Sequence, residues 1–266
     1  MTSCLFCTGT GPFNTVEHII PESLGNDDLT LAGEVCDSCQ AYFGKEVEQF
    51  VLVKSPLAFW RTRLRISTKK GRLPSVDLSN PPRPKGWLPT THPHHDNLIG
   101  FTAHEDGSSS VEIGDPRIVR DILEGRRRSF TFVATPKLLH MLARFLLKVG
   151  VELLASEDRS EARTSQYDDA RRHARFGTGD PLWPLFHFSH GDMKDLTYVE
   201  EDADGLVEHV RCYEYSLLAV HEYKLFVFSM GTDHWVISLS HRYPDPKILS
   251  AFPDHKVSLM WYPDIR

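Results

Sequence analysis

The chain has 266 residues, of which 41% are hydrophobic, so it can form one large domain or two smaller ones with a substantial buried core. Its formal net charge of −6 excludes a global positive field, and any contact with nucleic-acid phosphates must come from a local basic patch. The N-terminal residues lack a basic segment followed by an apolar run, which predicts a cytoplasmic protein without a signal peptide or membrane span. Five cysteines in such a chain favour reduced thiols or metal thiolates over disulfides.

Residues 1–53 are expected to form the first domain, with a short strand in VEHII, a polar loop and a helix from about Gln40 to Val53. The core of so small a unit cannot hold it folded, so a metal ion or another staple is needed. Two Cys-x-x-Cys turns can supply one, because two thiolates from each turn complete the tetrahedron that Zn²⁺ adopts in structural sites. The four predicted zinc ligands are Cys4, Cys7, Cys36 and Cys39.

Two unrelated pairs of turn cysteines, or a pair of redox disulfides, are the alternatives to zinc. Neither pair lies in the strand-to-helix context of a thioredoxin-like site, which favours the metal. Cys212 stands alone at the start of a predicted strand and is expected to be a small apolar core residue.

A charged pair, Glu17 and His18, ends the strand between the two cysteine pairs. Successive residues of a strand point to opposite faces, so one of the two can face a metal ion while its neighbour faces a substrate. Histidine, with an unperturbed pKa of about 6.5, is mostly the free base at neutral pH and can take a proton from water. A carboxylate such as Glu17 can hold a hard cation beside a reacting phosphate.

The order of these motifs is Cys-x-x-Cys, then EHIIPESLG, then Cys-x-x-Cys with a polar residue that opens a helix. This order resembles the HNH endonucleases with a four-cysteine zinc site, over about residues 1–50. The resemblance implies a ββα unit that binds one catalytic Mg²⁺ or Mn²⁺ ion and hydrolyses phosphodiester bonds in DNA, while the zinc is structural. By position, it implies that His18 is the general base and that Glu17 and Gln40 are ligands of the catalytic ion.

Two positions depart from the family pattern. Gln40 stands where the family usually has asparagine or histidine, and Gly44 stands where some members have a further ligand. The polar residue that orients the base should lie in the loop after the strand, and there we favour Asp28. The other candidates are Asn26, Asp27 and Thr30. A catalytically silent zinc module that binds nucleic acid or protein is therefore one alternative, and a nuclease that acts on RNA is another.

Residues 54–96 are expected to form a basic helix followed by a proline-rich linker. The first part carries seven basic residues and no acidic one, namely Lys54, Arg61, Arg63, Arg65, Lys69, Lys70 and Arg72. Directly after the nuclease-like motif, these residues could contact DNA phosphates and position a duplex without reading its sequence. The alternative is a solvated helix face followed by a basic turn.

Residues 97–266 are expected to form an α+β domain that serves target recognition, partner binding or regulation. LIGFTAHEDGSSSVEIG predicts a hairpin and SFTFVAT a strand, and the stretch from Pro136 to about Ala155 predicts a long helix. CYEYSLLAV, YKLFVFSM and HWVISLS predict an antiparallel meander.

The predicted fold class is thus α+β, with an N-terminal zinc-stapled ββα-metal unit followed by a larger α+β region that ends in the meander. Cleavage of both strands by a single-site enzyme would favour a homodimer or an activating protein partner. A host-defence role rests on family analogy alone.

Overall fold

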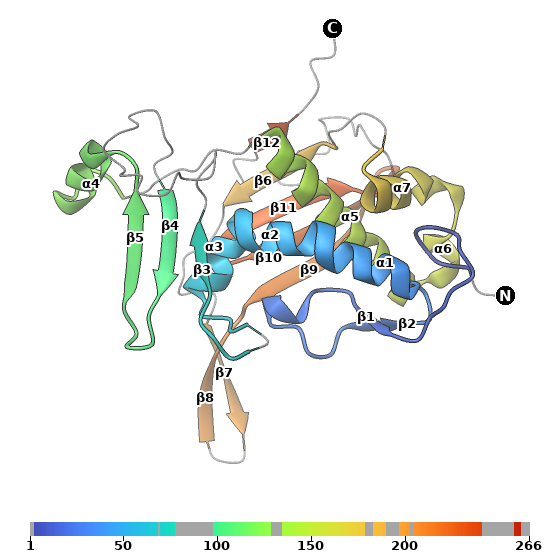
Figure 1. The fold of residues 1–266 in the computed structure, drawn as a ribbon, viewed down its shortest axis with the longest axis horizontal. Helices are drawn as coiled ribbons and strands as arrows, with labels where there is room; N and C mark the ends of the chain where they lie inside the picture. The colour runs from blue at the N-terminus through green and yellow to red at the C-terminus, as the bar shows by residue number, and fades with distance from the viewer. Residues whose placement is uncertain are drawn as a thin grey trace, which may run out of the picture. The chain divides into compact units, whose positions relative to one another are not determined.

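Figure 1 shows the computed structural model of the chain. It describes residues 3–68, 70–77, 98–128, 135–178, 183–189, 197–202, 205–240 and 258–261. Lys69, the proline-rich segment from 78 to 96 and most of the predicted strand SFTFVAT lie outside these described residues. The chain divides into two compact units, a first unit of Met1–Phe50 with Pro136–Arg266 and a second unit of Val51–Thr135. The expected division into three parts, with boundaries after residues 53 and 96, stays a prediction.

The N-terminal part of the first unit is a ββα arrangement, as predicted. Strand β1 (Val16–His18) pairs antiparallel with β2 (Thr30–Ala32), so that His18 lies opposite Thr30. A short 3-10 turn, η1 (Glu22–Leu24), lies in the loop between them. The following helix is continuous and consists of α1 (Asp37–Tyr42), the π-helical segment η2 (Phe43–Glu48) and α2 (Gln49–Lys54).

The C-terminal part of the first unit contains a five-stranded antiparallel sheet in the order β12-β6-β11-β10-β9. Its strands are β6 (Leu185–Ser189), β9 (Tyr213–Val220), β10 (Tyr223–Met230), β11 (Asp233–Ser238) and β12 (Ser258–Trp261). Strands β9, β10 and β11 form the predicted meander. Strands β7 (Thr197–Asp202) and β8 (Gly205–Val210) form a separate antiparallel hairpin.

Helix α5 (Pro136–Glu157) packs against one face of this sheet and against the ββα helix, which makes it the central element of the first unit (Figure 1). The rings of Phe145 and Phe228 meet edge to face across the contact. Gly150 lets the helix approach β10 closely, because a Cβ atom there would lie 2.8 Å from Cγ of Phe226. The other face of the sheet buries Phe186, Leu225 and Val236.

Three shorter elements follow α5 and pack beside it, namely α6 (Arg159–Ala162), η4 (Ser165–Tyr167) and α7 (Asp168–Phe176). Asp158 caps α6 by accepting hydrogen bonds from the backbone of Ser160 and Glu161. Ala170 and Ala174 of α7 are buried, so this charged segment has an inner face as well as a solvated one. No helix among the described residues is long and apolar enough to cross a membrane.

The second unit combines helix α3 (Pro56–Arg63) with a three-stranded antiparallel sheet in the order β3-β4-β5. The strands are β3 (Ser75–Asp77), β4 (Leu98–Ala103) and β5 (Ser109–Ile113), and helix α4 (Pro116–Leu123) follows them. The predicted hairpin is confirmed, and Gly107 takes the left-handed backbone conformation in its turn, with φ of 88°. Ala58, Val76 and Phe101 form a small core between helix and sheet.

Candidate metal centre and catalytic residues

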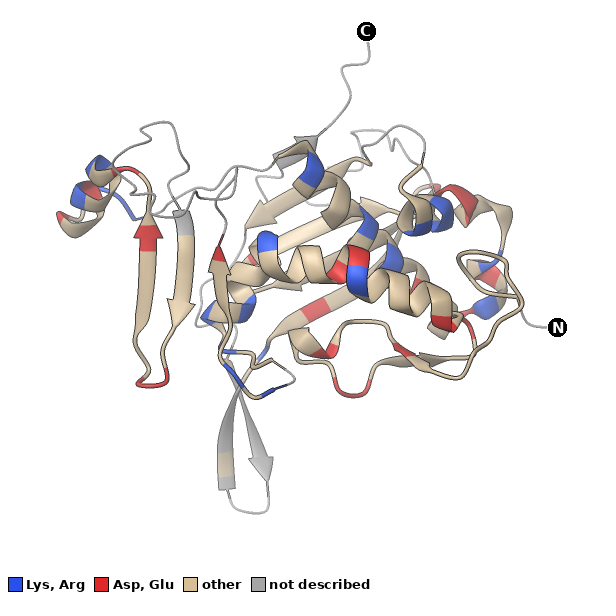
Figure 2. Cartoon of the chain, viewed as in Figure 1, with Lys and Arg blue, Asp and Glu red and all other residues tan. Residues whose placement is uncertain are grey.

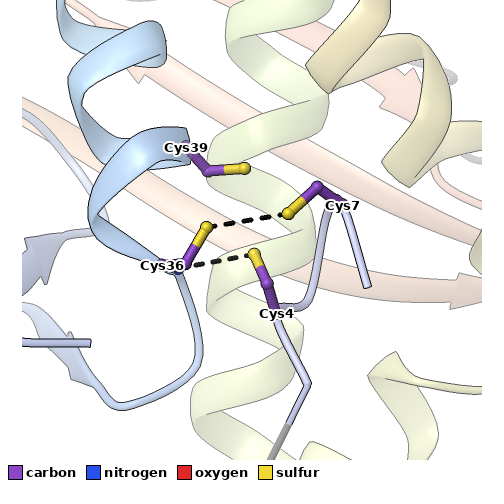
Figure 3. Close-up of side chains that lie close together, drawn as sticks. All are labelled: Cys4, Cys7, Cys36 and Cys39. Carbon is purple, nitrogen blue, oxygen red and sulfur yellow. Dashed lines mark hydrogen bonds between the residues drawn. The ribbon is translucent and has the colours of Figure 1, made fainter. Parts of the chain in front are cut away.

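The cysteines of the two Cys-x-x-Cys turns meet at one point, as Figure 3 shows. Their Sγ atoms all lie within 4.8 Å of one another, and all four are free thiols rather than disulfides. Cys4 and Cys7 come from the N-terminal turn, whereas Cys36 and Cys39 come from the start of α1. Four sulfur atoms gathered in this way suit the tetrahedral coordination of a structural Zn²⁺ ion.

The electrostatics of the cysteine cluster also suit a cation. A hydrogen bond from the Cys39 thiol lowers the pKa of Cys4 to about 4, whereas its thiolate partner and burial raise the pKa of Cys39 far above the usual range. Without a metal ion, the Cys4 thiolate thus opposes ionisation of the neighbouring Cys39 thiol. A divalent cation at the centre would remove that conflict, because it stabilises several thiolates at once.

Groups of the first unit contact the sulfur atoms from outside the cluster. Nε of Arg175, on α7, donates a hydrogen bond to Sγ of Cys39 at 3.2 Å, and Oγ of Ser38 lies 3.1 Å from Sγ of Cys36. The guanidinium of Arg175 also stacks on the ring of Tyr42, 3.8 Å from its centroid. Arg175 therefore links the cysteine cluster to the C-terminal half of the unit, and no motif in the sequence marks it for this role.

His18 lies at the end of β1 with its side chain about one third exposed, at 32%. Its Nε2 atom is 3.0 Å from Oε1 of Glu22, four residues further along the chain. Its Nδ1 atom is buried and has no hydrogen-bond partner among the described residues. Nε2 is therefore the ring nitrogen that a water molecule at the surface can reach, and Glu22 is the carboxylate beside it.

The loop after β1 is held by Asn26, which is buried. Its side-chain amide donates hydrogen bonds to the carbonyl oxygens of Ile20 and Leu29 at 2.6 and 3.0 Å, and its Oδ1 accepts one from the Leu29 backbone. Asn26 thus fixes the backbone just beyond His18. Asp28 is exposed, and the carboxylate that contacts the ring of His18 belongs to Glu22. A role for Asp28 in orienting the base therefore stays a prediction.

Glu17 points away from solvent towards Lys148 of α5. Nζ of Lys148 lies 2.6 Å from Glu17, 3.0 Å from Glu48 and 3.0 Å from Glu152, measured to the nearest carboxylate oxygens. We call these three carboxylates the acidic cluster. Lys148 and Glu152 are fully buried and lie one turn apart in α5, while Glu48 comes from the π-helical segment η2. Sequence analysis assigned these α5 residues only to a long helix.

Burial and charge act in opposite directions on the ammonium of this cluster. Burial lowers the pKa of Lys148, but the charges of Glu152, Glu48 and Glu17 outweigh it and raise the pKa well above its usual range. Burial raises the pKa of Glu152 well above that of an ordinary carboxyl, although Lys148 opposes the shift. Lys148 therefore stays charged at neutral pH.

Gln40 makes hydrogen bonds with both ends of its side-chain amide. Its Oε1 atom accepts from Oγ1 of Thr15 at 2.7 Å, and its Nε2 atom donates to the carbonyl oxygens of Thr15 and Val35. Glu17, the other expected ligand of the catalytic ion, is paired with Lys148. As arranged here, these two side chains do not fit a shared Mg²⁺ or Mn²⁺ ion, because such an ion needs available oxygen atoms.

The predicted basic patch lies in the second unit, on α3 and the segment that leads to β3 (Figure 2). Arg61 is buried, and Lys54 pairs with Asp77 at 3.7 Å. Arg65 donates hydrogen bonds to the carbonyl oxygens of the hairpin turn, at His104, Gly107 and Ser108. Among the described members of the patch, the exposed ones are Arg63, Lys70 and Arg72.

The cysteine cluster, β1, β2 and the following helix share one stretch of the chain. Comparison with curated proteins and with solved structures found no match. Comparison with family models found one for this stretch, and residues 4–54 match the family described as HNH endonuclease.

Proposed function

We propose that the chain is an HNH-type nuclease that hydrolyses phosphodiester bonds in DNA, with His18 as the general base. The observation that carries the proposal is the match of residues 4–54 to the HNH endonuclease family together with the partly exposed His18 beside Glu22. A nucleic acid is the substrate class that the family match suggests. The choice of DNA rests on the resemblance and on the basic patch.

The chemistry follows from the position of the His18 ring. Nδ1 is buried, so Nε2 is the ring nitrogen that would take a proton from a water molecule attacking a phosphodiester. For this step the Glu22 carboxylate must release Nε2, because a ring nitrogen that donates a hydrogen bond to a carboxylate has no free lone pair. After the transfer, the carboxylate of Glu22 would again accept a hydrogen bond from the protonated Nε2 and stabilise the imidazolium. Asn26 keeps the loop beyond His18 in place. Glu17 and Gln40, as arranged here, do not fit a metal ion that could assist this step.

DNA would be bound through phosphate contacts. Arg63, Lys70 and Arg72 are the described basic residues best placed for this role, since their side chains are exposed. Contacts of this kind fix the register of a duplex without reading its sequence. Arg65 and Arg61 are expected to support the second unit instead, through the hairpin turn and through burial.

A catalytically silent zinc module that binds nucleic acid or protein is the second candidate. The pairing of Glu17 with Lys148 and the hydrogen bonds of Gln40 favour it, because they engage both expected ligands of the catalytic ion. A silent module would keep the cysteine cluster and lose cleavage.

A cleavage assay separates the candidates. Zinc-loaded protein is incubated with supercoiled plasmid, single-stranded DNA or RNA of matched sequence, each with Mg²⁺, Mn²⁺ or a chelator. His18→Ala should reduce cleavage about 10²–10⁴-fold, the usual contribution of a general base. His187→Ala is the matched control, because His187 also lies 3.1 Å from a carboxylate, that of Asp233, and is partly exposed.

The outcomes of this assay distinguish the candidate functions. Cleavage that survives His18→Ala would contradict the proposed base. Preferential cleavage of RNA would favour the alternative of a nuclease that acts on RNA. Binding without cleavage under every condition would favour the silent module. Light scattering of the same samples would test the predicted homodimer.

A further inference from the structure

Among the described residues, five oxygen atoms surround the ammonium group of Lys148. Three are the carboxylate oxygens of the acidic cluster, at 2.6, 3.0 and 3.0 Å. The other two are the backbone carbonyl oxygens of His18 and Ile19, at 3.0 and 3.2 Å. They come from β1 and its following residue, η2 and α5, so separate elements of the first unit converge on one cationic group.

This environment has more acceptors than an ammonium group can use. Lys148 has three N–H donors for the five oxygens, and three carboxylates share its single positive charge. Glu152 is fully buried, and its Oε1 atom has no hydrogen-bond partner among the described residues. An oxygen-lined and anionic surrounding of this kind is typical of a site for a hard cation such as Mg²⁺ or Mn²⁺.

We propose that Lys148 is the resident cation of the acidic cluster and that its ammonium group excludes a divalent cation from Glu17. A single charged amine and a metal ion cannot occupy the same space between the carboxylates, and the like charges repel each other. The chain thus carries its own cation at the residue that matches a metal ligand in the family. Lys148 fills this cluster whether or not the chain cleaves nucleic acid.

The position of Lys148 also explains why Glu17 is buried. The ammonium group binds the side chain of Glu17 and the backbone carbonyl oxygens of the two residues that follow it. It therefore fixes the end of β1 against α5 as well as neutralising the carboxylate. If Lys148 were replaced by a small neutral residue, the carboxylates would remain together and leave space for another cation.

The test counts bound Mn²⁺ on the full chain, loaded with zinc beforehand so that the thiols are filled. Free Mn²⁺ is measured by electron paramagnetic resonance, which does not depend on nuclease activity. Lys148→Ala should bind about one more Mn²⁺ ion per chain than the wild type. Lys137→Ala, which removes an exposed lysine from the same helix, should bind no more than the wild type. Adding Glu17→Gln to Lys148→Ala should remove the gained ion.

Two results would overturn the proposal. One is a wild-type chain that binds Mn²⁺ and loses it on Glu17→Gln, because the ion would then share Glu17 with Lys148. The other is a folded Lys148→Ala variant that gains no ion. Neither result depends on cleavage, so a failure of the proposed nuclease function is recognised separately.

A second variant tests the proposal in case Lys148→Ala alone does not fold. Lys148→Ala leaves three carboxylates close together, whereas Lys148→Ala with Glu152→Gln removes one charge and keeps Glu17 and Glu48 as ligands. Thermal unfolding of both variants is followed with and without Mn²⁺. Mn²⁺ should raise both unfolding temperatures, because an ion that binds only the folded chain stabilises it. If Mn²⁺ stabilises neither variant, the cluster is not a cation site and the proposal fails.

Discussion

The cysteine cluster and the acidic cluster both bring anionic groups together in the first unit, but they balance the charge in different ways. At the cysteines, Arg175 donates one hydrogen bond from the side, and the centre between the sulfur atoms suits a metal ion. In the acidic cluster, the chain places the ammonium of Lys148 among the carboxylates. The first cluster is thus suited to couple folding to an external ion, whereas the second is neutralised in part by folding itself.

The largest expected effect comes from breaking the cysteine cluster. Cys36→Ser should lower the zinc content by about one ion per chain and unfold the N-terminal part, because structural zinc contributes about 10–16 kcal/mol of apparent binding free energy. Metal analysis and circular dichroism of the purified protein measure both effects. Cys212→Ser is the control, since this cysteine lies outside the cluster, and it should keep the zinc. A folded Cys36→Ser protein with full zinc content would contradict the four-cysteine site.

Removing the internal cation should have the next largest effect. Without divalent ions, Lys148→Ala should lower the free energy of unfolding by about 3–5 kcal/mol, because it leaves buried carboxylates without their partner. Urea unfolding measures the change. Lys137→Ala removes the same charge from an exposed position in α5 and should change the stability by less than about 0.5 kcal/mol. Equal effects of the two variants would show that burial of Lys148 does not matter.

The two clusters also differ in how far sequence reasoning could find them. The cysteines form two short motifs within one unit, so their spacing predicted the cluster, and the resemblance to the HNH endonucleases implied the ββα fold around it. The acidic cluster joins Glu17 to Lys148, 131 positions apart in the sequence, and depends on how α5 packs. Charges inside an apolar helix were its only sequence signal, and an amphipathic helix accounts equally well for that pattern.

A similar limit applies to His18 and Gln40. The motif identified His18 and Gln40 as candidate site residues. Only the packed structure shows that His18 contacts Glu22 and that Gln40 forms hydrogen bonds with Thr15. Side-chain partners of this kind depend on the loop after β1, whose path is held by Asn26. Sequence spacing does not determine that path.

A smaller effect should follow from changing Arg175, which contacts the cysteine cluster from α7. Arg175→Gln removes the charged donor to Cys39 and should weaken zinc binding about 10–100-fold, the usual effect of losing a partner of a metal ligand. Competition with a coloured chelator measures the zinc affinity. Arg172→Gln, at an exposed position of the same helix, should leave it unchanged. An unchanged affinity for Arg175→Gln would limit Arg175 to packing on Tyr42.

The smallest effect concerns the pH dependence of the acidic cluster. Burial raises the pKa of Glu152 above the ordinary value of 4.5, so the folded chain holds this proton more tightly than the unfolded chain. The contribution of Glu152 to stability is thus complete below pH 4.5 and is lost as the pH rises towards its folded pKa, by up to about 1.4 kcal/mol per pH unit. Glu152→Gln cannot lose a proton, so its stability relative to the wild type should increase over the same range in urea unfolding. Glu157→Gln, at an exposed position of the same helix, controls for the loss of a carboxylate, and a parallel pH profile for all three proteins would show that Glu152 does not titrate with folding.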